Sequence, residues 1–322
     1  MDNKLINLQM DFINQRLGTF IHWNSAATQF HNSPDIIDWE FDVENGGAER
    51  IYPFNEADWN PKHLDCDRWA EIAKSAGCRF AILTTKHHEG FALWDSKYSE
   101  HCVRNATNKT DIVAEFLRAF RKAGIRAGLY FSILDLTSKL GRYDFTEEHR
   151  TMVLGQITEL LTNYGEIPYL IIDGWNAPWG GPSYKTFPFE EVDALVKKLQ
   201  PNCLLMNIGC TEGISGTDII FYENGAGQEL EDGFKGPGAL CQKLTRTWFY
   251  RDEHETEPVK SAEWAIDLMN TCFEMNTAFI MNLSPDPDGV VHDNLAERFA
   301  EIGKKISLPA PIETLPDGWQ IR

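Results

Sequence analysis

Eight short apolar runs alternate with segments of helical periodicity along this chain of 322 residues, and this alternation is the feature that most constrains its fold. The runs predicted as strands are 18–23, 79–84, 126–132, 169–173, 203–207, 218–223, 244–250 and 277–282. Strands separated by helices form parallel sheets with right-handed crossovers, and eight strands are the number that closes a barrel. The sequence therefore predicts an α/β fold, a (β/α)₈ TIM barrel.

Amphipathic segments between these runs supply the helices that such a barrel needs. The predicted helices are a lead-in helix within 1–17, followed by 65–76, 111–123, 146–165, 189–199, 261–275 and 294–306. An open doubly wound sheet is the competing topology, and it would carry a glycine-rich phosphate-binding turn after the first strand. The residues that follow the first run, Trp23-Asn24-Ser25-Ala26, are not such a turn.

The chain contains no internal repeat and no linker, so we expect one domain over residues 1–322. Residues 24–64 form a long connection after the first strand, and residues 307–322 form an extended, proline-containing tail. A connection of this length in a compact domain is functional or disordered. Its bulky aromatic residues, which include Phe30, Trp39, Phe41, Tyr52 and Phe54, favour a folded loop that lines a site.

Composition excludes several kinds of partner. The formal net charge is −18, which repels the phosphates of nucleic acids and of anionic membranes. No apolar run approaches the roughly 20 residues of a membrane span, and no signal peptide is visible at the N-terminus. The seven cysteines are odd in number and contain no Cys-x-x-Cys, which argues against disulfides and against a zinc site. These features predict a cytoplasmic location.

Polar and aromatic side chains follow the predicted strands, at the end of a barrel where active sites lie. These residues are His22, Trp23, His87, His88, Tyr130, Asp173, Asn207, Glu223, Trp248, Phe249, Tyr250 and Asn282. Two carboxylates in an aromatic, hydrogen-bonding pocket are what glycoside hydrolysis requires, one ionised and one holding its proton. The carboxylates would be Asp173 and Glu223. Asp173 could instead cap the following turn.

The sequence also allows another acid/base residue and a metal site. Glu229 and Glu231 lie in the acidic loop after Glu223, and either could supply the acid/base in its place. His22, His87 and His88 could together hold zinc, although no His-x-His or His-Glu-x-x-His spacing supports a metal. We therefore predict no metal.

Several segments resemble the α-L-fucosidases of glycoside hydrolase family 29. The matching segments are Gly18-Thr-Phe-Ile-His22-Trp23, Leu83-Thr-Thr-Lys-His-His-Glu-Gly-Phe-Ala-Leu-Trp94, Gly128-Leu-Tyr-Phe-Ser132, Leu160-Leu-Thr-Asn-Tyr-Gly165, Ile171-Ile-Asp-Gly174 and Met281-Asn-Leu-Ser-Pro-Asp-Pro-Asp-Gly289. The resemblance covers roughly residues 16–306 in the family's order, and the Lys-His-His-x-Gly-Phe-x-Leu-Trp run is highly specific.

The resemblance implies a retaining exo-glycosidase that removes terminal α-L-fucosyl residues from fucosylated glycans by double displacement, without metal or organic cofactor. Asp173 matches the family's nucleophile, and Glu223 is placed as acid/base from its spacing. The residues implied to contact the sugar are His22, Trp39, His87, His88, Tyr130, Trp248 and Phe249. Many members carry a C-terminal β-sandwich, and we expect no such domain within residues 1–322.

Two further functions fit the same residues. Transglycosylation differs from hydrolysis only in whether a sugar or water reaches the intermediate. A catalytically inactive fucose- or carbohydrate-binding barrel is the alternative from another class of protein. The sequence does not define the fucosyl linkage or the aglycone. It is compatible with a homo-oligomer.

Overall fold

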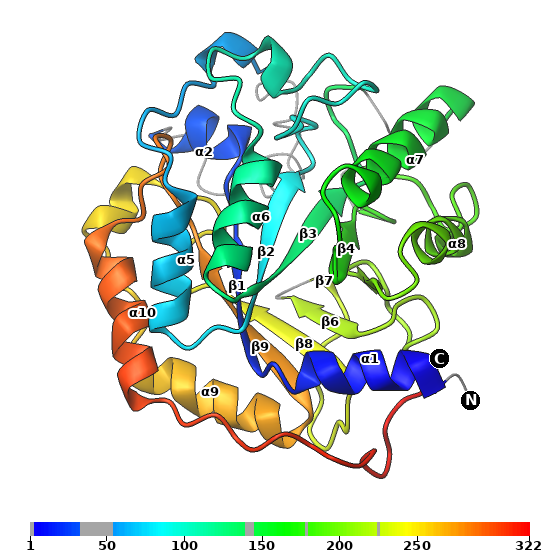
Figure 1. Ribbon diagram of the computed structural model, residues 1–322, viewed down its shortest axis with the longest axis vertical. Coiled ribbons are helices and arrows are strands. Elements are labelled where there is room, and N and C mark those ends of the chain that lie inside the picture. The colour runs from blue at the N-terminus through cyan, green and yellow to red at the C-terminus, as the bar shows by residue number, and fades with distance from the viewer. Residues whose placement is uncertain (1–2, 33–53, 139–144, 178–179, 224–225) are drawn as a thin grey trace.

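Eight parallel strands form a nearly closed barrel with helices packed around it (Figure 1). The computed structural model describes residues 3–32, 54–138, 145–177, 180–223 and 226–322. The barrel strands are β1 (Leu17–Ile21), β2 (Phe80–Lys86), β3 (Arg126–Ser132), β4 (Tyr169–Asp173), β5 (Leu204–Asn207), β6 (Ile220–Glu223), β8 (Gly238–Gln242) and β9 (Thr277–Leu283). The short β7 (Ala226–Gly227) pairs antiparallel with β6.

The strand order confirms the predicted topology. Hydrogen-bonded neighbours run β5-β4-β3-β2-β1-β9-β8-β6, all parallel, so the sheet curls until β5 and β6 face each other. The residues before β6 bridge this last seam, because Asp218 N donates to Leu205 O at 2.8 Å and Leu205 N donates to Asp218 Oδ2 at 2.7 Å. The Asp218 carboxylate thus takes the place of a backbone hydrogen bond between β5 and β6.

Helices cover the outside of the barrel. They are α1 (Asn3–Ile13), α2 (Ser25–Phe30), α5 (Cys66–Ser75), α6 (Ile112–Lys122), α7 (Glu147–Thr162), α8 (Phe189–Leu199), α9 (Ala262–Glu274) and α10 (Asp293–Lys305), with 3₁₀ turns at Glu56–Asp58, Val103–Asn105 and Asp252–Glu255. Several begin where the sequence offers a capping side chain: Asp65, Asp111 and Ser261 each accept a hydrogen bond from the backbone of the first turn. No helix in the described ranges has both the length and the apolarity to cross a bilayer.

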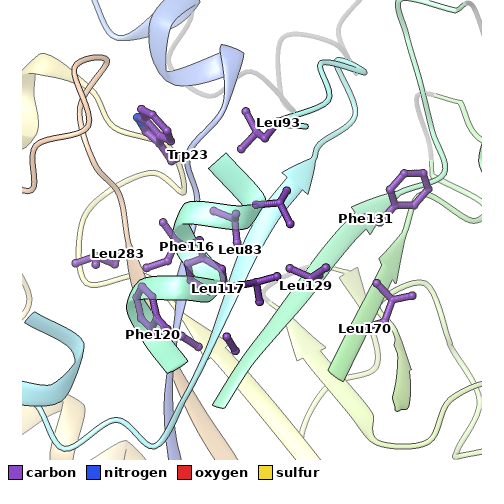
Figure 2. Packing of buried hydrophobic residues seen from close by; sticks show 14 of the residues in the cluster. Trp23, Leu83, Leu93, Phe116, Leu117, Phe120, Leu129, Phe131, Leu170 and Leu283 are labelled. Atoms are coloured by element: carbon purple, nitrogen blue, oxygen red, sulfur yellow. The ribbon is translucent and has the colours of Figure 1, made fainter. Parts of the chain in front are cut away.

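The apolar residues form two cores, because successive side chains of a strand point to opposite faces. Phe20, Ile82, Ile171 and Phe221 belong to the cluster that fills the barrel. The second cluster lies between the strands and the helices, where Phe116, Leu117 and Phe120 of α6 pack over Leu83 and Leu129 (Figure 2).

Helix α1 closes the end of the barrel at which the strands begin. The ring of Phe12 lies 5.0 Å from those of Phe80 and Tyr169, at the starts of β2 and β4. The extended tail lies beside this helix, where Trp319 Nε1 donates to Gln9 Oε1 at 3.2 Å. The chemistry predicted for strand ends must therefore occur at the opposite opening.

The prediction of the seventh strand is wrong. Residues 244–250 form an irregular segment, and the strand is β8 at Gly238–Gln242, within and just after the stretch predicted as loop. The run Thr247-Trp-Phe-Tyr250 has the aromatic composition of a strand, whereas β8 is short and begins directly after Pro237. Tertiary pairing with β6 and β9 selects Gly238–Gln242 over the run with the higher β-propensity.

Candidate active site

Asp173 is the last residue of β4 and points to the inside of the barrel, since it shares the alternation of Tyr169 and Ile171. Its Oδ1 accepts a hydrogen bond from Gly174 N at 2.6 Å. Gly174 has φ +100°, a conformation that side-chain-bearing residues rarely adopt, and it turns the chain away from the strand. The carboxylate is 17% exposed, so it is held at the opening rather than buried.

The other oxygen of this carboxylate accepts a hydrogen bond from Tyr130 and lies near His88. Tyr130 of β3 donates its hydroxyl to Asp173 Oδ2 at 2.7 Å. His88, just after β2, places Nε2 3.5 Å from the same oxygen. Ser132 Oγ donates to Leu134 O and therefore accepts from His88 Nδ1, at 2.6 Å. Burial lowers the pKa of His88, and a neutral His88 whose proton is on Nδ1 has none on Nε2 to donate, so the Tyr130 hydroxyl is the group that orients this oxygen.

His22 is a neutral hydrogen-bonding group. Asn282 Nδ2 donates to Trp248 O at 2.7 Å, so Asn282 Oδ1 accepts from His22 Nδ1, at 2.6 Å. Burial lowers the pKa of His22 to about 3, and the charge of Lys243 also lowers it. The ring therefore carries its proton on Nδ1, and Nε2 is an acceptor.

His87 lies in an aromatic wall with Tyr130 and Phe249. Its ring stacks on Tyr130 with centroids 5.7 Å apart and meets the edge of Phe249 at 4.9 Å. Trp248 stacks on His22 at 5.0 Å. Although Trp248 and Phe249 do not belong to a strand, the structure brings them to the predicted histidines.

Glu223 ends β6 and shares the inward alternation of Ile219 and Phe221. It is half-buried, whereas Glu229 and Glu231 are exposed. Its charge raises the pKa of the Cys241 thiol inside the barrel, although burial is the larger cause. Position and burial therefore place Glu223, and not the exposed loop glutamates, at the inner side of the barrel opening. Trp39 lies outside the described residues.

Lys243 is a site residue that sequence reasoning missed. It follows β8 and continues the inward alternation of Ala239 and Cys241. Its Nζ lies 4.9 Å from the ring centroid of Trp248. A polar residue directly after a strand indicates a site residue. Because the seventh strand was predicted at residues 244–250, Lys243 preceded the predicted strand and did not follow it.

A buried ion pair includes Lys86, the residue that precedes His87 and His88. Lys86 Nζ lies 3.2 Å from Asp135 Oδ2 and 3.1 Å from Gln156 Oε1, and both charged side chains are almost completely inaccessible. Burial lowers the pKa of Lys86, and Asp135 raises it. Lys86 ends β2 and directly precedes His87, so the ion pair anchors the strand end next to the histidines.

No group of three or more His, Cys, Asp or Glu in the described residues is placed as a ligand set. His22 and His88 instead have the hydrogen-bond partners given above, and His87 Nδ1 contacts Glu89. A cavity of about 470 Å³ lies at the opposite end of the barrel, beside Arg126 and Tyr169, away from this chemistry.

Fold and site together define a (β/α)₈ barrel whose opening at the strand ends carries carboxylates, histidines and aromatic rings, the groups that glycoside hydrolysis requires. The chain belongs to the Alpha-L-fucosidase family, whose sequence model matches residues 2–308.

Individual relatives agree with this placement. Alpha-L-fucosidase 1 of Arabidopsis thaliana is 31% identical over 78% of this chain and 54% of that protein, so the chain spans about half the length of this relative. Tissue alpha-L-fucosidase of Homo sapiens is 25% identical, with 97% and 70% covered. The structure of alpha-L-fucosidase isoenzyme 1 from Paenibacillus thiaminolyticus has a TM-score of 0.76 at 27% identity, with 94% of this chain and 76% of that chain covered.

Proposed function

We propose that this protein hydrolyses terminal α-L-fucosyl residues with retention of configuration. The observation that carries the proposal is the Asp173 carboxylate, held at the barrel opening by Tyr130 on Oδ2 and by Gly174 N on Oδ1. An ionised, oriented carboxylate beside a second inward carboxylate is the machinery of double displacement. Membership of the family supports fucose as the sugar.

In the first step, Asp173 attacks the anomeric carbon while Glu223 gives its proton to the departing oxygen. The bond from carbon to the leaving group breaks and an ester to Asp173 forms. In the second step, Glu223 takes a proton from water, and the resulting hydroxide displaces Asp173. Retention requires the two carboxyl groups to lie about 5–5.5 Å apart, whereas an inverting pair lies about 6.5–9.5 Å apart.

The remaining residues would bind and orient the sugar. Neutral His22 offers Nε2 as an acceptor for a sugar hydroxyl, since its Nδ1 is engaged by Asn282. Trp248 and Phe249 offer apolar faces for the C6 methyl group of fucose. Trp39 is proposed to contact the sugar on the resemblance alone.

For location we propose the cytoplasm. All seven cysteines are free and buried, which suits a reducing compartment.

The direct test is the anomer released first. Hydrolysis of an aryl α-L-fucoside, followed by proton NMR before mutarotation, should show α-L-fucose first. Release of β-L-fucose first would exclude double displacement at Asp173. Binding of L-fucose without turnover of any aryl fucoside would favour the inactive sugar-binding alternative.

A further inference from the structure

The carboxyl group of Glu89 is completely buried and contacts a predicted sugar-binding histidine. Its Oε2 lies 3.1 Å from His87 Nδ1, and its Oε1 accepts a hydrogen bond from Ser25 Oγ at 3.2 Å. None of the roles assigned above requires Glu89. A buried carboxyl group that is not part of an ordinary ion pair calls for a specific explanation.

Glu89 is held from three parts of the barrel opening. Ser25 belongs to α2 after β1, and Glu89 itself follows β2. From the segment after β3, Thr137 Oγ1 donates to the backbone carbonyl of Glu89 at 2.7 Å. The side chain therefore has little freedom to move away from His87.

The charges around this pair disfavour an ion pair between Glu89 and His87. The pKa of Glu89 is raised to about 8. Burial is the largest cause and Asp135, which itself pairs with Lys86, also raises it, whereas hydrogen bonds from backbone N–H groups and from Ser25 lower it. Burial holds the pKa of His87 well below its usual value, with added effects of His88 and His22. The pair is therefore most stable with both groups neutral, until Glu89 ionises.

We propose that Glu89 is a positioning residue that decides, through His87 Nδ1, whether His87 Nε2 donates or accepts a hydrogen bond toward the bound sugar. This inference rests on the proposed function insofar as His87 faces the sugar.

The protons balance in both states. Protonated Glu89 donates to Nδ1, so the single proton of neutral His87 sits on Nε2, which donates to a sugar oxygen. When Nε2 loses its proton to solvent, the Glu89 proton moves to Nδ1. Ionised Glu89 then accepts from Nδ1, and Nε2 can only accept. One proton leaves, and the polarity of the sugar-facing atom reverses.

The direct test is the tautomer of His87, followed by nitrogen NMR with ¹⁵N-labelled histidine and assigned by the signals missing from His87→Gln. In the unmodified protein, the proton should move from Nε2 to Nδ1 as the pH rises from about 6.5 to about 9.5. In Glu89→Gln, which has no ionisable group, the tautomer should stay the same across this range. Glu159→Gln is the matched control, because Glu159 is also buried but accepts from Trp94 and Lys97 instead.

Ser25→Ala is a second variant that leaves Glu89 in place. It removes a hydrogen bond that favours the ionised carboxylate, so the midpoint of the tautomer change should move to higher pH. This test remains decisive if Glu89→Gln does not fold. A tautomer that does not respond to pH in the unmodified protein, or that responds equally in Glu89→Gln, would overturn the proposal.

Affinity for L-fucose supplies the functional measurement. The dissociation constant should change by about tenfold between the two pH values in the unmodified protein and in Glu159→Gln, but should be constant in Glu89→Gln. A pH-independent affinity in all three proteins would contradict the proposed polarity reversal. The tautomer measurement does not depend on turnover, so failure of the hydrolase assignment and failure of this inference give different results.

Discussion

Tyr130 donates its hydroxyl to Asp173 Oδ2 at 2.7 Å across 43 positions of sequence. The register of β3 and β4 makes this contact, because it sets Tyr130 beside Ile171 and Ser132 beside Asp173. Tyr130 points into the barrel and reaches the carboxylate one inward position further along the neighbouring strand. His88 reaches Ser132 through the pairing of β2 with β3, so two strand pairings bring Tyr130 and His88 to Asp173 Oδ2.

Replacing Tyr130 with Phe should lower kcat/KM for an aryl α-L-fucoside by about tenfold to a hundredfold. A hydrogen bond to a charged group contributes about 1.5–3 kcal/mol, and Phe removes it while keeping the ring that stacks on His87. Tyr169→Phe is the matched control, since Tyr169 also lies inside the barrel but contacts Arg126 at the opposite end. Equal losses in both variants would show that the effect is structural.

Asp173→Ala should lower activity by about 10⁶-fold, the order of magnitude reported when a catalytic nucleophile is removed. Its melting temperature should change little, because Asp173 is partly exposed at the rim. Added azide should partly restore turnover and give the inverted fucosyl azide, detectable by NMR. A variant that keeps a tenth of the activity would rule out Asp173 as the nucleophile.

Glu223→Ala should impair substrates with poor leaving groups far more than activated aryl fucosides, because only the former require proton donation. Azide should rescue it with retained configuration, by attack on the glycosyl-enzyme. Glu229→Ala and Glu231→Ala are the matched controls, since both residues are exposed in the loop after β6. If one of them shows the leaving-group dependence and Glu223→Ala does not, the acid/base lies in that loop.

Lys86→Met should lower the free energy of unfolding by about 3–5 kcal/mol, because it leaves Asp135 buried without a partner. Urea denaturation measures the change. The double variant Lys86→Met/Asp135→Asn should recover part of it, since no unpaired charge remains. Lys305→Met removes an exposed pair with Glu301 and should have little effect. No recovery in the double variant would show that packing, rather than charge, explains the loss.

Stability should fall as the pH drops below about 6.5 because of buried neutral histidines. Burial lowers the pKa of His22 to about 3 and that of His254 to about 4, so the unfolded chain binds protons at these positions before the folded protein does. Each histidine then gives a slope of up to about 1.4 kcal/mol per pH unit between its folded and unfolded pKa values.

His254→Gln should flatten this dependence, and His63→Gln should not, since the His63 side chain is 68% exposed. Glu89 acts in the opposite sense: its pKa of about 8 means that folding takes up a proton, and its contribution declines as the pH rises from about 4.5 to about 8. The contribution of Glu89 to the pH dependence of stability is the same in both variants, so it cancels when they are compared. Parallel stability curves for the two variants would exclude the buried histidine as the cause.

The sequence by itself determined the alternating strands and helices and the chemistry at the tips of most strands. Asp173 could be predicted because it ends a short apolar run before a glycine. His22 could be predicted because it directly follows another apolar run. Such signals are local: side-chain alternation and turn residues are written in neighbouring positions. The expectation of a single domain stays a prediction.

Tertiary structure decided what local pattern could not. It placed the seventh strand at Gly238–Gln242, because pairing with β6 and β9 outweighs the β-propensity of Thr247–Tyr250. It brought Lys243 to Trp248, and Glu89 between His87 and Ser25. These contacts depend on strand register and on burial, which arise only when segments distant in the sequence pack together and exclude water.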